Sequence, residues 1–283
     1  MSKWLRQMVT TSRGVFEVFI KGEGEPVCVT HLYSEFNDSG DYFADIFANA
    51  NKVFLVNLRD VGSSDKPKFP HELSMIDAVL DLEAIRQAFG YDKWIFAGHS
   101  TGGMLGLIYG IHFSYYLKSL VVVGSSAREY SSTSPKCIYN EGHPNYKRMQ
   151  ALMELLKKPD LTKEVRLQLS KERTQFSLYH PESFDELFSS NIHKKISATR
   201  LNFFGREVLI YDVTRQLDKV ETPVHILCGR HDVQCPVELS IEMKELLPQA
   251  SLHIFEQSNH YPFLEEKELF IQTINEVLET KET

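Results

Sequence analysis

The chain has 283 residues, which is long enough for one large α/β core with room for an inserted segment. Apolar residues make up 42% of it and charged residues 24%, which is typical of an ordinary globular protein in water. The formal net charge of −7 argues against a nucleic-acid or anionic-membrane partner, because binding to phosphates needs a basic face.

The sequence carries no targeting or membrane-spanning signal. Residues 1–15 contain no apolar run long enough for a signal peptide, and no stretch approaches the roughly 20 apolar residues of a membrane span. The cysteines show no CxxC spacing and are expected to be reduced thiols: Cys28, Cys137, Cys228 and Cys235. We therefore expect a cytoplasmic protein, and the oligomeric state is left open.

Strand and helix patterns alternate along the first part of the chain and again toward its end. Short apolar runs rich in β-branched and aromatic residues predict strands at residues 15–21, 27–30, 53–58, 94–97, 120–123, 225–228 and 252–255. Apolar side chains at three- and four-residue spacing predict helices between Ser74 and Gly90, through 105–109, and over 263–278. This alternation predicts an α/β fold with a mainly parallel sheet and right-handed crossovers.

The alternation stops in the middle of the chain. The pattern there is helical and polar, at residues 146–157, 163–175 and 181–188. We interpret residues 1–126 and 218–283 as one core, and residues 127–217 as a helical lid inserted after the strand at 120–123.

A glycine-flanked serine lies between a predicted strand and a predicted helix. The letters GHSTG at residues 98–102 fit the G-x-S-x-G nucleophile elbow, whose turn is too tight for side chains at its two glycines. Such a turn lifts the Ser100 hydroxyl above the sheet edge, and the N–H of Thr101 at the helix start can stabilise an oxyanion. The same letters alone also fit an ordinary glycine-rich turn.

Two further residues follow predicted strands in the order serine, acid, histidine that this fold imposes. Asp232 comes after the strand at 225–228, and His260 after the strand at 252–255. We predict that His260 is the general base that takes the proton of Ser100, and that Asp232 orients the imidazole. Three matches at three strand ends are hard to meet by accident.

Neighbouring residues offer weaker alternatives. His99 flanks the serine and His231 flanks the acid, but each should point away from the catalytic residue beside it. Glu129, after the strand at 120–123, is a second candidate acid. No cluster of His, Cys, Asp and Glu has metal-ligand spacing and no glycine-rich phosphate loop is present, so we expect neither a metal nor a cofactor.

These residues in this order resemble the α/β-hydrolase superfamily over nearly the whole chain. The letters NLRDVGSSDKP at 57–67 are similar to the D-x-R-G-x-G-x-S-x-x-P segment of that fold, with Asp60 in place of the first glycine. The first oxyanion loop of the superfamily reads His-Gly, whereas this chain has HLY at 31–33. The resemblance implies that Tyr33 supplies an oxyanion N–H beside that of Thr101.

Within the superfamily the chain looks most like the proline iminopeptidase-related branch, whose enzymes remove an amino-terminal proline from peptides. The similarity is carried by GRHDVQCP at 229–236, by SNHYPF at 258–263 and by the helical lid. The His-Gly-Gly-Pro-Gly loop and the Gly-Gly-Ser-Trp-Gly elbow of that branch are both absent.

The residues and the resemblance together predict a serine hydrolase that cleaves a small-molecule ester or amide, or a short peptide, through an acyl-enzyme. A proline iminopeptidase-like aminopeptidase and a carboxylesterase of unknown substrate both stay open, as does a non-catalytic small-molecule sensor. An aminopeptidase needs a carboxylate to pair with the α-ammonium of its substrate. The lid offers five candidates for this: Glu141, Glu154, Glu182, Glu186 and Glu207.

Overall fold

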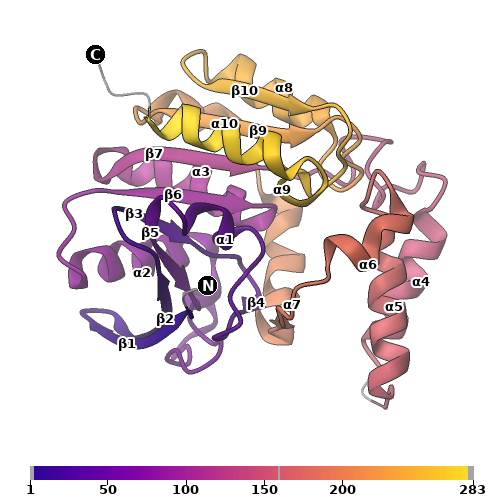
Figure 1. Ribbon diagram of the computed structural model, residues 1–283, viewed down its shortest axis with the longest axis horizontal. Coiled ribbons are helices and arrows are strands. Elements are labelled where there is room, and N and C mark those ends of the chain that lie inside the picture. Colours follow the sequence, from indigo (N-terminus) through magenta and orange to yellow (C-terminus); the bar gives the residue numbers. More distant parts are fainter. Residues whose placement is uncertain (1–2, 159, 280–283) are drawn as a thin grey trace.

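The computed structural model describes residues 3–158 and 160–279 (Figure 1). Residues 1–2 and 280–283 of the predicted core, and residue 159 of the predicted lid, lie outside the described residues. The expectation that residues 1–15 form no signal peptide therefore falls partly outside them as well.

An eight-stranded sheet forms the centre of the molecule, with the strand order β1-β2-β5-β3-β6-β7-β9-β10. The pairs from β5 to β10 are parallel, and β2 runs antiparallel to both β1 and β5. This confirms the predicted α/β fold with a mainly parallel sheet. The strands are β1 (Leu5–Thr11), β2 (Gly14–Lys21), β3 (Glu25–Val29), β5 (Asn51–Val56), β6 (Trp94–His99), β7 (Leu117–Val123), β9 (Val224–Gly229) and β10 (Ser251–Phe255).

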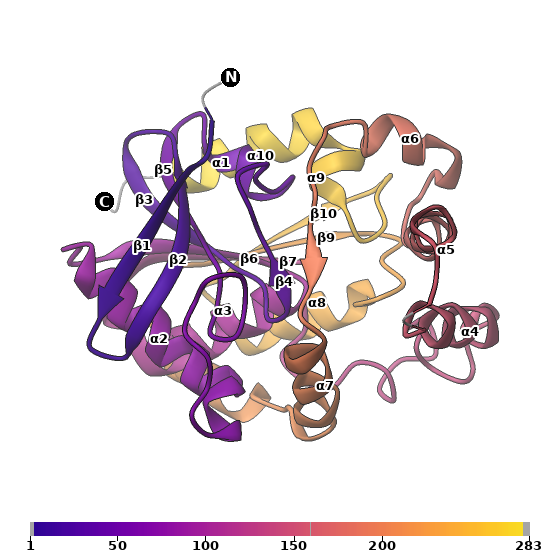
Figure 2. The ribbon, with the colours of Figure 1, turned by 90° about the horizontal axis from the view of Figure 1, so that it is seen from below.

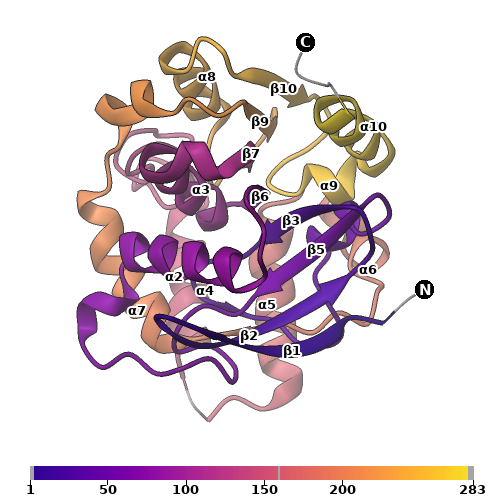
Figure 3. The ribbon, with the colours of Figure 1, turned by 90° about the vertical axis from the view of Figure 1, so that its left-hand side faces the viewer.

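Strand β1 was missed in the sequence. It lies at the edge of the sheet, beyond β2 (Figure 3), and Val9 is its only buried residue. An edge strand with one buried side chain has no apolar run to reveal it. Its place in the sheet depends on the hairpin through Gly14, whose φ of 140° suits a glycine.

Helices cover both faces of the sheet (Figure 2). Each face has its own apolar core. One face carries α2 (Met75–Ala88), α3 (Thr101–Phe113) and α8 (Val237–Leu246), and the other carries α1 (Ala44–Phe47) and α10 (Lys267–Glu279). Helix α2 begins as expected, because the Ser74 side chain accepts a hydrogen bond from Asp77 N at 3.2 Å. It ends before Gly90, whose φ is 76°.

The helix expected over 263–278 is wrong as one element. The structure has α9 (Pro262–Glu265) and α10, with Glu266 between them at φ −122° and ψ 50°. The Glu266 carboxylate accepts hydrogen bonds from Gln257 N at 2.9 Å and Ser258 Oγ at 2.7 Å. The break thus lets a carboxylate hold the loop that precedes His260, a tertiary contact that helical periodicity does not reveal.

The inserted segment 127–217 lies outside the eight-stranded sheet (Figures 1 and 2). It contains α4 (Tyr146–Leu156), α5 (Lys163–Gln175), α6 (Phe184–Leu187), β8 (Lys195–Ile196) and α7 (Ala198–Glu207). In Figure 1, α4 and α5 stand apart from the sheet, whereas α7 lies close to it. Strand β8 pairs with β4 (Ser34–Glu35) in a separate two-stranded sheet. That this segment acts as a lid stays a prediction.

The described residues also contain short 3₁₀ helices at Pro70–Leu73, Ser114–Tyr116, Pro181–Ser183, Val208–Ile210 and Thr214–Lys219. Among the described residues, no helix combines the length and the apolar character that crossing a bilayer requires.

Candidate active site

Ser100 lies in a sharp turn between β6 and α3. Its φ of 56° and ψ of −121° are rare for a residue with a side chain, and cost about 1–2 kcal/mol. A Cβ atom at Gly98 would overlap the carbonyl of Gly102, and one at Gly102 would overlap the carbonyl of Thr30. The two glycines of the predicted elbow are therefore required by backbone packing.

Hydrogen bonds hold the serine in this strained conformation. Ser100 N donates to Val123 O at the end of β7, at 2.9 Å, and Gly103 N donates to Ser100 O at 2.9 Å. A strained backbone persists only where its surroundings hold it, and such sites gather where function needs them.

Asp232 and His260 meet at the ends of β9 and β10. His260 Nδ1 lies 2.8 Å from Asp232 Oδ2, and both side chains are buried. The other carboxylate oxygen of Asp232 accepts hydrogen bonds from the backbone N–H groups of Gln234 and Cys235, both at 2.8 Å. Asp232 is thus fixed in position, and it fixes one ring nitrogen of His260.

The serine turn borders the histidine loop. His99 Nε2 lies 2.8 Å from His260 O, and the two imidazole rings are 4.5 Å apart between centroids. No hydrogen bond joins Ser100 Oγ to His260 within the described part of the chain. Catalytic hydrogen bonds are often long without substrate and shorten in the reactive complex.

Gly124 was missed in the sequence. It follows β7 at φ 50°, and a Cβ there would lie 3.1 Å from Asp232 Oδ2 and 3.3 Å from His260 Nδ1. A strand-end glycine was the available signal, but only the fold shows that the Asp232–His260 pair lies against it.

The alternative residues have other partners. The Glu129 carboxylate accepts hydrogen bonds from Ser131 and Ser132, and none from His260. His231 is exposed and stacks on Tyr179, with ring centroids 4.6 Å apart. Burial, together with the nearby His260, lowers the pKa of His99 well below its usual value. Of the two candidate acids, Asp232 alone contacts the His260 imidazole.

The two predicted oxyanion donors lie on adjoining backbone segments. Within the described residues, the N–H groups of Tyr33 and Thr101 donate to no other protein group. His31 links the segments: its Nε2 lies 3.1 Å from Thr101 Oγ1 and its Nδ1 lies 3.0 Å from Ser34 Oγ. Burial lowers the pKa of His31 to about 3, so this bridge is neutral at neutral pH.

Leucine replaces the usual glycine of this loop without backbone strain. Among described residues other than glycine, positive φ angles occur only at Asp60 and Ser100, so Leu32 keeps an ordinary conformation. At Asp60 the φ of 66° explains why the resembling segment has glycine there. Its carboxylate is paired with Lys66 at 2.9 Å.

Arg200 of α7 contacts the loop that carries Tyr33, and no sequence signal predicted it. The side chain is only 2% exposed. Its guanidinium donates hydrogen bonds to three backbone carbonyls, those of Leu32, Arg59 and Leu73. Burial lowers the pKa of Arg200 to about 10. Ser197 N adds a hydrogen bond to Tyr33 O at 2.8 Å, so the end of the inserted segment holds this loop from outside the sheet.

The five lid glutamates are exposed or bound elsewhere. Glu141 and Glu186 are exposed, Glu154 pairs with Lys157, and Glu182 contacts His180 at 3.1 Å. Glu207 accepts a hydrogen bond from Met75 N at 2.9 Å, at the start of α2. None of the five has a contact with Ser100, Asp232 or His260 among the interactions of the described residues.

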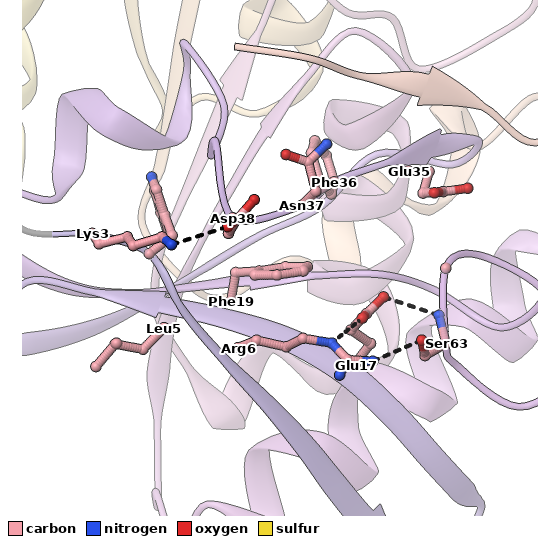
Figure 4. A pocket seen from close by; sticks show the side chains of 12 residues that line it. Lys3, Leu5, Arg6, Glu17, Phe19, Glu35, Phe36, Asn37, Asp38 and Ser63 are labelled. Carbon is pink, nitrogen blue, oxygen red and sulfur yellow. Dashed lines mark hydrogen bonds and ion pairs between the residues drawn. The ribbon is translucent and has the colours of Figure 1, made fainter. Parts of the chain in front are cut away.

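A pocket of about 630 Å³ opens elsewhere, along β1, β2 and the loop after β4 (Figure 4). Four of its charged side chains form two ion pairs, Lys3 with Asp38 at 3.3 Å and Arg6 with Glu17. The pocket contains no residue of the predicted triad. Within residues 3–158 and 160–279, no group of three or more His, Cys, Asp or Glu side chains is arranged to hold a metal ion.

Known proteins resemble this chain in sequence and in fold. The family described as alpha/beta hydrolase fold matches residues 28–267. A proline iminopeptidase of Saccharolobus solfataricus is 28% identical over 258 residues, which cover 85% of this chain and 81% of that protein. A pimeloyl-(acyl-carrier protein) methyl ester esterase of Vibrio atlanticus is 26% identical over 255 residues, with coverage of 89% and 93%. The solved structure of an alpha/beta fold family hydrolase from Bacillus anthracis str. Sterne has a TM-score of 0.94 and 42% identity, with coverage of 97% and 99%.

Proposed function

The chain belongs to the alpha/beta hydrolase fold family and is a hydrolase, and from that premise we propose that it is a serine hydrolase that cleaves carboxylic esters through an acyl-enzyme. The proposal depends on one observation. Ser100 lies in a strained turn that borders the loop of His260, and the buried His260 is hydrogen-bonded to the buried carboxylate of Asp232. The expected resemblance to the α/β-hydrolase superfamily is confirmed, and a proline iminopeptidase is among the relatives, as the sequence predicted.

In the proposed reaction, His260 takes the proton of Ser100 as the serine oxygen attacks the ester carbonyl. His260 then gives this proton to the leaving alcohol, and the acyl group stays on Ser100. Water, activated in turn by His260, attacks the acyl-enzyme and releases the acid. Asp232 holds the imidazole in the required tautomer and stabilises the imidazolium, a role supported by the contact of 2.8 Å.

The oxyanion of each tetrahedral intermediate is assigned to the N–H groups of Thr101 and Tyr33. Their lack of other protein acceptors among the described residues supports this assignment. Backbone donors held in place before the reaction stabilise developing charge without reorganisation. The inserted segment 127–217 is proposed to lie over this centre as a lid, supported by the hydrogen bond from His260 N to Ser177 O at 3.2 Å.

Esters are preferred over prolyl amides in this proposal because no lid glutamate is directed at the reaction centre. A free α-ammonium in a covered site is costly unless a carboxylate pairs with it. A proline iminopeptidase-like activity is the second candidate, supported by the named relative at 28% identity. We also propose that the substrate is a small molecule or a short peptide and that the protein acts in the cytoplasm.

The test is turnover of chromogenic acyl esters and prolyl amides, together with labelling by a fluorophosphonate. Ser100→Ala should lower ester turnover by on the order of 10⁴-fold or more and abolish labelling. Ser189→Ala, in an exposed serine of the inserted segment, is the matched control and should change neither. Labelling that survives in Ser100→Ala would remove Ser100 as the nucleophile, and prolyl amides turned over faster than esters would favour the second candidate.

A further inference from the structure

One cation of the inserted segment has no partner. Arg173 lies in the last turn of α5, half-buried, and makes no hydrogen bond or ion pair with any described residue. The carboxylate next to it in the chain is already used, because Glu172 binds Arg148 through two contacts of 2.6 and 2.7 Å.

The end of α5 lies at the reaction centre. Ser177, one helical turn beyond Arg173, accepts a hydrogen bond from His260 N at 3.2 Å. The Ser177 hydroxyl also accepts one from Gln234 Nε2 at 2.9 Å, and Gln234 N donates to the Asp232 carboxylate. The chain that follows Arg173 is therefore bound directly to the base, and to the acid through Gln234.

Three half-buried tyrosines from three different segments lie within electrostatic range of Arg173. Tyr139 donates to Gln234 Oε1 at 2.9 Å, Tyr261 packs edge-on against His260, and Tyr33 packs edge-on against His31. Burial raises the pKa of all three hydroxyls, and the positive charge of Arg173 opposes this rise in each case. The guanidinium thus lies near three parts of the proposed site. These are the loop of Tyr33, the segment of Tyr139 that binds Gln234, and the loop of His260.

The carboxylates near this cluster are engaged. Asp232 is held by His260 and two backbone N–H groups, and Glu265 accepts hydrogen bonds from the N–H groups of Asn259 and Tyr179. A partly desolvated cation among neutral hydroxyls is stabilised by an anion that arrives with the substrate. A guanidinium and a carboxylate match in shape and can form two parallel hydrogen bonds.

We propose that Arg173 binds a carboxylate on the substrate, so that this enzyme prefers esters that carry a free, ionised carboxyl group. The inference rests on the proposed serine hydrolase function and names the substrate class of the same site. The proposal also disfavours a substrate with a free α-ammonium, because the positive charge of Arg173 would repel it.

Matched ester pairs test the proposal. One pair is mono-p-nitrophenyl glutarate and p-nitrophenyl pentanoate, with the charge on the acyl side. The other is 4-(butyryloxy)benzoate and its methyl ester, with the charge on the leaving group. The natural protein should prefer the anionic member of at least one pair, and Arg173→Met should lower kcat/KM for that member by on the order of 10- to 100-fold. Turnover of the neutral esters should stay unchanged.

Two further variants serve as controls. Lys163→Met removes one positive charge from the exposed start of the same helix and should leave the preference intact. Arg173→Lys keeps the charge but loses the planar pair of donors, and should retain part of the preference. Equal turnover of charged and neutral esters, or a preference that survives in Arg173→Met, would overturn the carboxylate site alone. No turnover of any ester together with no fluorophosphonate labelling would instead reject the serine hydrolase.

Discussion

The edge of the sheet that carries Ser100 and the inserted segment 127–217 are built differently. The sheet edge is closely packed. A Cβ at Gly98 or Gly102 would overlap a backbone carbonyl, and one at Gly124 would press on the side chains of Asp232 and His260. In the inserted segment, α5 has no buried residue at all, and α4 buries only Met149 and Leu152.

Under the proposed function, this difference separates the part that performs the reaction from the part that selects the substrate. A packed backbone leaves little room for substitution around Ser100. Half-exposed side chains on α4 and α5 can change at little cost in stability. Relatives named as a peptidase and as an ester hydrolase match this chain at similar identity, as expected if the inserted segment decides the substrate.

Helix α7 is the exception within the inserted segment. Its Arg200 is buried against carbonyls of the core, and Ser197 and Glu207 add hydrogen bonds to Tyr33 O and Met75 N. The inserted segment therefore has an anchoring part, α7, that supports the loop of Tyr33, and the substrate-selecting role proposed for the segment falls to α4 and α5.

The largest expected effect lies at the sheet edge. Asp232→Asn should lower ester turnover by on the order of 10⁴-fold, because the amide no longer holds the required tautomer of His260. Stopped assays at saturating ester give kcat, and circular dichroism checks that the variant is folded. Glu129→Gln is the control and should stay within a few-fold of the natural protein. If Asp232→Asn lost only a few-fold, the acid would lie elsewhere.

A substitution in the anchoring helix α7 should lower the rate less than Asp232→Asn does, and it should also lower the stability of the fold. Arg200→Met leaves three carbonyls without a donor and should lower the free energy of unfolding by about 1–3 kcal/mol. It should also lower kcat by roughly tenfold with little change in KM, because the loop of Tyr33 loses a support that matters in the transition state. Urea unfolding and ester kinetics measure the two effects.

Arg206→Met, in an exposed arginine of the same helix, is the control and should change neither quantity. A rise in KM at constant kcat in Arg200→Met would mean that α7 contacts the substrate instead of the oxyanion loop.

The smallest effect, when it is taken over a single pH unit, concerns acid stability. The folded pKa of His31 is about 3, below its usual value of 6.5, so the unfolded chain binds more protons between these limits. Stability should therefore fall as pH drops from 6.5 toward 3, with His31 contributing about 1.4 kcal/mol per pH unit. Urea unfolding at several pH values should show a shallower dependence in His31→Gln. His180→Gln, in the exposed part of the inserted segment, should keep the slope, and an equal slope in all three proteins would contradict this account.

Local patterns in the sequence were sufficient for the framework. Buried parallel strands are short apolar runs, so β2, β3, β5, β6, β7, β9 and β10 could all be predicted, as could α2 with its Ser74 cap. Parallel strands share one edge for their carboxyl ends, which is why chain order alone placed Ser100, Asp232 and His260 together. Their catalytic roles stay predictions, as do those of Tyr33 and Thr101.

Only the tertiary structure decided which residues surround that framework. Arg200 reaches Leu32 across 168 positions of sequence, and Arg173 lies beside the reaction centre because Ser177 and Gln234 bring α5 there. The break between α9 and α10 likewise follows from carboxylates that hold the His260 loop. Such contacts join segments that share no common periodicity. The sequence also does not show whether a charged side chain faces solvent, a backbone carbonyl or a substrate.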